Sequence, residues 1–129
     1  MTVFIDTDVV IEVLRGRNRA FTENWQRLAA SQVAILISPV TIAEVGAGAR
    51  PREKDAIARL FTPLICVSID PLIGHRAGEY LFRYAKSHNV EVGDALIAAS
   101  AVHSNAALWT RSRKHYPMPE LTMHVGGSE

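Results

Sequence analysis

The sequence is poor in the residues that build covalent or thiol-based sites. Among its 129 residues there is a single cysteine, Cys66, so no internal disulfide can form and no zinc site can be built from cysteine alone. Cys66 lies in the apolar stretch "LICVSI", and we expect it to be a small core residue. Four histidines, His75, His88, His103 and His124, show no ligand spacing, and we expect His103 to be a core residue.

Long apolar runs and a dominant charge are also missing. No uncharged segment is long and apolar enough to cross a bilayer, and no basic region precedes the first apolar run, so we expect a soluble cytoplasmic protein. Lysine and arginine number 14 against 13 aspartate and glutamate. This near balance neither requires nor excludes binding to nucleic acid.

Short apolar runs that alternate with helical patterns predict an α/β domain with a mainly parallel sheet. At 48% apolar content, one domain over residues 1–125 can form a real core, and we expect the "GGSE" tail at 126–129 to be disordered. We expect strands at residues 2–5, 34–37, 63–69, 107–110 and 121–125. We expect helices at residues 10–16, 20–30, 39–61 (with a new start at Pro51), 71–87 and 94–102.

Three acids stand alone in apolar surroundings. Asp6 closes the first predicted strand, Glu44 is the only charge between residues 35 and 49, and Asp94 is the only acid between residues 92 and 110. Burying an ionised carboxylate without a partner costs several kcal/mol or more. Each of these acids therefore needs a partner or a site.

Each acid has a simple alternative explanation. Asp6 is explained equally well as a turn residue, and Asp94 as a first-turn acid that the helix dipole stabilises. Glu44 has no Lys or Arg three or four residues away, although it could lie on a water-facing side of its helix. For the neighbouring Asp8 we expect helix capping.

A joint explanation is that the three acids converge. In a parallel α/β sheet, ligands bind where the strands end and the next helices begin, and Asp6, Glu44 and Asp94 are all expected near that edge. Oxygen ligands without His or Cys suit Mg²⁺ or Mn²⁺. Arginines in bordering segments are candidate phosphate contacts, with ordinary surface arginine as the alternative: Arg15, Arg111 and Arg113.

Four stretches in this order resemble PIN-domain ribonucleases, specifically the VapC-type toxins of type II toxin–antitoxin pairs. They are "FIDTDVVIEVLRG", "SPVTIAEVGAG", "VGDALIAASA" and "LWTRSRKHY". The resemblance implies a three-layer α/β/α sandwich and a Mg²⁺- or Mn²⁺-dependent endoribonuclease. It maps the catalytic, metal-binding acids onto Asp6, Glu44 and Asp94, and a supporting hydroxyl onto Thr7. It also implies RNA as substrate, a VapB-type antitoxin as partner, and a homodimer.

The fourth stretch departs from the family pattern. Ser112 stands where Asn or Asp is often found, and His115 stands where another acid is common. Ser112 could still orient a metal-bound water, but one corner of the expected acidic site is neutral. A PIN-fold protein that binds RNA or a partner without cutting is therefore the main alternative, and a structure-specific DNA nuclease is a further one.

Overall fold

A computed structural model describes residues 2–125, so the tail at 126–129 lies outside the described residues. Its centre is a four-stranded sheet in the order β3-β2-β1-β4. The strands are β1 (Thr2–Ile5), β2 (Ala34–Ile37), β3 (Ile65–Cys66) and β4 (Ala107–Trp109). All three strand pairings are parallel, which confirms the predicted sheet type.

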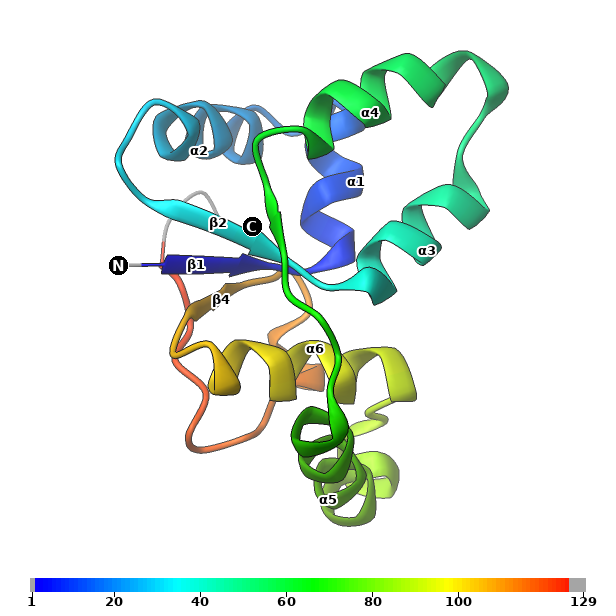
Figure 1. Ribbon diagram of the computed structural model, residues 1–129, viewed down its shortest axis with the longest axis vertical. Helices are drawn as coiled ribbons and strands as arrows, with labels where there is room; N and C mark the ends of the chain where they lie inside the picture. Colours follow the sequence, from blue (N-terminus) through cyan, green and yellow to red (C-terminus); the bar gives the residue numbers. More distant parts are fainter. Residues whose placement is uncertain (1, 126–129) are drawn as a thin grey trace.

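Helices cover both faces of the sheet and make the expected three layers (Figure 1). On one face lie α1 (Thr7–Arg15), α2 (Arg19–Ala29), α3 (Pro39–Gly48) and α4 (Lys54–Phe61). On the other lie α5 (Pro71–His88) and α6 (Val92–His103). Two short 3-10 helices, η1 (Pro51–Glu53) and η2 (Arg113–His115), complete the secondary structure of residues 2–125.

The strand alternation divides the core between the two faces. Val3 and Ile5 of β1 pack with α1 and α2, whereas Phe4 points to the opposite face and packs with α5 and α6. All three side chains are fully buried. Because strand side chains alternate with a period of two, a sheet covered on both faces needs apolar residues at every position, as "TVFI" and "AILI" provide.

Local capping chemistry sets the helix boundaries near the sheet edge. The Asp6 side chain caps α1, and Gly16 ends that helix in the left-handed region with φ of 65°. Ser38 caps α3 ahead of Pro39, and Asp70 caps α5 ahead of Pro71, as the sequence predicts. The helices that follow β1 and β2 therefore begin directly at the carboxyl ends of these strands.

Several sequence expectations are wrong. The segment 121–125 is not a strand, because it forms only an isolated bridge between Leu108 and Met123. In the segment 39–61 the first helix ends at Gly48, and the expected new start at Pro51 is confirmed, although its first turn is the 3-10 helix η1. Strand β3 is two residues long at the sheet edge, which leaves Cys66 exposed. His103 is exposed, because it lies in the last turn of α6 and not within its buried stretch.

Within residues 2–125, none of the helices combines the length and the apolar character that crossing a membrane requires.

Candidate active site at the carboxyl ends of the strands

Four acids gather where β1, β2 and β4 end, and we call them the acidic rim: Asp6, Asp8, Glu44 and Asp94. Asp6 and Asp8 stand at the start of α1, directly after β1. Glu44 lies in α3, the helix after β2, and Asp94 lies in the first turn of α6. Acids that are remote in the sequence thus share one edge of the sheet, as the sequence predicts for three of them.

Asp6 and Asp8 form the inner half of the rim. Asp6 is 6% exposed and accepts hydrogen bonds from the Thr7 N–H at 2.8 Å and from Thr110 Oγ1 at 2.7 Å. Thr110 Oγ1 also lies 3.4 Å from Asp8 Oδ2. Burial, together with the nearby Asp8 charge, raises the pKa of Asp6 to about 7. Two carboxylates are therefore held close together, and no basic side chain within residues 2–125 pairs with Asp6.

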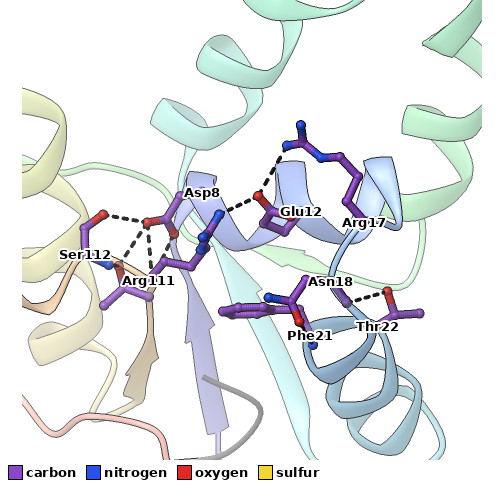
Figure 2. A network of polar contacts seen from close by, with 9 residues as sticks. Asp8, Glu12, Arg17, Asn18, Phe21, Thr22, Arg111 and Ser112 are labelled. Atoms are coloured by element: carbon purple, nitrogen blue, oxygen red, sulfur yellow. Dashed lines mark hydrogen bonds and ion pairs between the residues drawn. The ribbon is translucent and has the colours of Figure 1, made fainter. Parts of the chain in front are cut away.

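The loop after β4 holds Asp8 in place. Ser112 Oγ donates to Asp8 Oδ2 at 2.9 Å, and the backbone N–H of Arg111 lies 3.3 Å from both Asp8 oxygens (Figure 2). Burial raises the pKa of Asp8 despite these donors. Asp8 does not cap α1, because Asp6 does. The expectation that Asp8 serves as a helix cap is therefore wrong, and it belongs to the acidic rim.

Glu44 is positioned by hydroxyl groups. Thr7 Oγ1 donates to Glu44 Oε1 at 2.6 Å and lies 3.0 Å from the buried Thr41 Oγ1. Glu44 also lies against α6, because a Cβ atom built on Gly93 would meet Glu44 Oε2 at 3.1 Å. Thr7 therefore contacts Glu44 directly, and Gly93 leaves the room that the Glu44 carboxylate occupies.

Asp94 is joined to Asp6 through a buried tyrosine. The Tyr116 hydroxyl lies 3.5 Å from Asp94 Oδ1 and also interacts with the Asp6 side chain. Burial and the charges of Asp6 and Asp94 raise the pKa of Tyr116 well above its usual value, so this hydroxyl stays protonated and available as a donor. His115 Nδ1 lies 3.3 Å from Asp94 Oδ2, on the outer side of the same carboxylate.

The structure also supports the ordinary structural roles of these acids, as helix caps or exposed helix residues. Asp6 is the N-cap of α1, and Asp94 Oδ2 accepts from the Glu91 N–H in a capping box. Glu44 is an exposed helix residue. No three His, Cys, Asp or Glu side chains among residues 2–125 are arranged as a ready-made metal site. Binding of one cation by Asp6, Glu44 and Asp94 therefore requires these side chains to turn from their present hydrogen bonds.

The donor chemistry nevertheless fits a hard divalent cation. The groups at the rim are carboxylates and hydroxyls, the ligands that Mg²⁺ and Mn²⁺ prefer. In the part of the chain that the structure describes, the buried Asp6 has no cationic partner, and burial together with the Asp8 charge raises its pKa. A bound cation would remove that cost.

Two of the three arginines expected to contact RNA are bound to acids. Arg111 pairs with the buried Glu12 and lies over the Phe21 ring at 5.6 Å, and Arg17 pairs with the same glutamate (Figure 2). Arg15 pairs with Glu53 at 3.0 Å. The third, Arg113, donates to the backbone oxygen of His124 at 3.2 Å. Arg111 and Arg113 flank Ser112 beside the rim, whereas Arg15 lies at the far end of α1; Arg15 and Arg111 are already neutralised.

Three residues of the site escaped the sequence reasoning: Asp8, Thr110 and Tyr116. Thr110 and Tyr116 both belong to the stretch "LWTRSRKHY", which the resemblance singles out. The signal for Thr110 was its place directly after β4, at the same sheet edge as Asp6. Nothing in the sequence signals that Tyr116 reaches back from beyond η2 to contact two acids.

Comparison with known proteins decides the family. The PIN domain model matches residues 3–119. The chain belongs to the PIN-domain family. Ribonuclease VapC10 of Mycobacterium tuberculosis is 35% identical over 119 residues, which cover 92% of this chain and 88% of VapC10. Ribonuclease VapC19 of the same organism is 30% identical over 125 residues, with 91% and 94% coverage.

A solved structure agrees with this PIN assignment at the level of the fold. A chain in the crystal structure of VapBC2 from Rickettsia felis, bound to a DNA fragment from its promoter, superposes with a TM-score of 0.81. The match has 20% sequence identity and covers 98% of this chain and 99% of the other. The predicted three-layer PIN fold and the homology to VapC ribonucleases are thus both confirmed.

Proposed function

We propose that this PIN domain is a Mg²⁺- or Mn²⁺-dependent endoribonuclease that acts as the toxin of a toxin–antitoxin pair. The observation that carries the proposal is the gathering of acids from α1, α3 and α6 at one sheet edge of a PIN-family chain. The naming of the relatives VapC10 and VapC19 as ribonucleases supports it.

Asp6, Glu44 and Asp94 would hold the cation, and Asp8 would add charge at the inner side of the site. When bound, the cation supplies charge neutralisation at the scissile phosphate and a lowered pKa for a bound water. Thr7 and Thr110 orient Glu44 and Asp6 through their hydroxyls. Tyr116 contacts both Asp6 and Asp94 and would keep these two acids near each other until the cation binds.

A non-cutting RNA- or partner-binding protein is the weaker alternative. Its support in the sequence is the neutral Ser112 at a position that is often acidic. Ser112 Oγ, however, donates to the carboxylate of Asp8 in α1, so Asp8 supplies an acid beside the position where Ser112 is neutral. The structure thus offers four carboxylates for the site, and we favour the catalytic proposal.

The activity is tested with purified protein and single-stranded RNA. We expect cutting with Mg²⁺ or Mn²⁺ and loss of cutting with EDTA. A water that attacks the phosphorus opposite the 3′-oxygen would break the P–O3′ bond, so the products should carry a 5′-phosphate and a 3′-hydroxyl. Asp94→Asn should abolish cutting while the far-UV spectrum and thermal unfolding stay close to wild type. If RNA stays intact with every divalent cation, or if cutting persists in EDTA, the proposed mechanism is wrong.

We also propose a VapB-type antitoxin partner, a homodimer and a cytoplasmic location. Large apolar side chains at the surface support a protein partner, notably Phe82 at 93% exposed and Leu72 at 67%, both on α5. Expression together with the neighbouring gene should yield a co-purifying small protein that suppresses RNA cutting. Isolation of a free, fully active monomer from such cells would contradict this part of the proposal.

A further inference from the structure

Two pockets flank η2, and both adjoin the acidic rim. One has a volume of about 470 Å³ and is lined by Arg111, Ser112, Arg113 and Lys114. The other has a volume of about 320 Å³ and is lined by Lys86, Ser87, His88, Asn89, Lys114 and His115. We call the two together the basic groove, because they share Lys114 and no acid lines either one.

Each pocket reaches a different half of the acidic rim. Ser112 of the larger pocket donates to Asp8 at 2.9 Å, and His115 of the smaller pocket lies 3.3 Å from Asp94. The basic groove therefore adjoins the rim at two points, Asp8 and Asp94. A chain of phosphates bound to Lys114 and Lys86 would lie on the His115 side of the rim, next to Asp94.

The cations of the groove differ in availability. Among residues 2–125, neither Lys86 nor Lys114 forms an ion pair with an acid, and both are exposed. Arg111 is already paired with Glu12. Two of the three lysines of the chain thus line one groove with their charges uncompensated.

We propose that Lys86 and Lys114 bind the backbone phosphates of single-stranded RNA on the Asp94 side of the cutting site. The proposal rests on the proposed ribonuclease function. Exposed ammonium groups suit phosphate oxygens as point charges without sequence preference, whereas the paired Arg111 holds the loop after β4 in place. The groove thereby replaces Arg15 and Arg111 as the principal phosphate contact.

The test measures equilibrium binding of a fluorescent, random-sequence 20-nucleotide single-stranded RNA. Binding is followed by anisotropy with the Glu44→Gln protein in Mg²⁺, and the RNA is checked on a gel for integrity. Removing two phosphate contacts by Lys86→Ala and Lys114→Ala should weaken RNA binding about tenfold at 100 mM NaCl. The slope of the logarithm of the binding constant against the logarithm of the NaCl concentration should become shallower by about 1.4. The matched control, Arg27→Ala with Lys54→Ala, removes two charges from α2 and α4 on the other face of the sheet (Figure 1).

The charge-preserving pair Lys86→Arg and Lys114→Arg should restore the salt slope, which separates loss of charge from loss of fold. If the alanine pair binds RNA as the control pair does, the groove proposal is overturned. Cutting by the wild-type protein is measured in parallel. Wild-type cutting together with an unaffected alanine pair refutes the groove alone, whereas absence of both cutting and RNA binding refutes the ribonuclease function itself.

Discussion

The two halves of the acidic rim differ in burial and in the groups that surround them. Asp6 and Asp8 are enclosed at the start of α1, share the Thr110 hydroxyl and have raised pKa values. Glu44 and Asp94 lie on separate helices; Glu44 accepts from the Thr7 hydroxyl, and Asp94 contacts the Glu91 N–H, the Tyr116 hydroxyl and His115. The inner half therefore carries an electrostatic cost in the absence of a cation, whereas Glu44 in the outer half is exposed to solvent.

The largest loss of cutting rate should come from replacing a single acid, whether it belongs to the inner or to the outer half of the rim. Asp6→Asn and Asp94→Asn should each lower the rate of RNA cutting by at least about 10³-fold, because each removes a charge that holds the cation at the phosphate. Asp55→Asn, in the first turn of α4, is the matched control and should cut normally. Retention of more than a tenth of the wild-type rate by Asp6→Asn would remove the inner half from the mechanism.

The next largest effect concerns Mn²⁺ affinity. Two variants separate the contribution of the Asp8 charge from that of the hydrogen bonds to Asp8. Asp8→Asn keeps acceptors for Ser112 Oγ and the Arg111 N–H but loses the carboxylate charge. We expect Mn²⁺ affinity, measured by calorimetry, to fall about tenfold, whereas Ser112→Ala should lower it only about twofold. Equal Mn²⁺ affinity of Asp8→Asn and wild type would show that Asp8 only holds the loop after β4.

The free energy of unfolding of the metal-free protein should depend on pH through Asp6. The Asp6 pKa of about 7 lies above its usual value of 3.8, so the metal-free protein should lose stability as pH rises from about 4 through 7. At pH 8 in EDTA, Asp6→Asn should therefore gain about 1–2 kcal/mol, or about 5 °C in thermal unfolding. The gain should vanish near pH 4, where Asp6 is protonated in both states.

The outer half provides the comparison for that experiment. Glu44→Gln should give no such gain at pH 8, because Glu44 is exposed. A pH-independent difference between Asp6→Asn and wild type, or an equal gain in Glu44→Gln, would mean that burial does not distinguish the two halves.

The smallest effect concerns the room beside Glu44. Gly93→Ala places a methyl group 3.1 Å from Glu44 Oε2, so the carboxylate must shift by a few tenths of an ångström. We expect about a threefold loss in cutting rate with no loss of stability, because alanine is the better helix former. Gly78→Ala in α5, which meets nothing within 4 Å, is the control. Identical rates for the two variants would show that Glu44 tolerates the shift.

Sequence patterns predicted the layers and the sheet edge well, because they follow from local rules. The unbroken apolar stretches of β1 and β2 indicate strands covered on both faces, and Ser38 with Pro39 marks a helix start. The isolation of Glu44 in apolar sequence led to its prediction as a site residue, and the structure places it beside Thr7 and Gly93. These signals need no knowledge of distant contacts.

The predictions that were wrong concern residues whose surroundings depend on contacts between distant parts of the chain. Asp8 and Asp6 are both good capping residues, and only the loop after β4, about a hundred residues away, determines which one caps and which one faces Ser112. Arg111 belongs to a basic cluster in the sequence, but Glu12 and Phe21 meet it only in the fold. Cys66 lies in an apolar stretch of the sequence, but its side chain is exposed because β3 lies at the sheet edge.

Anomalous diffraction from a crystal grown with Mn²⁺ tests the central claim most directly. We expect one strong peak between α1, α3 and α6, with carboxylate oxygens of Asp6 and Asp94 at about 2.1 Å from it. The same peak should be absent from Asp6→Asn crystals. A peak bound elsewhere on the surface, or wild-type crystals without any peak at saturating Mn²⁺, would contradict the claim that these acids meet to hold a cation.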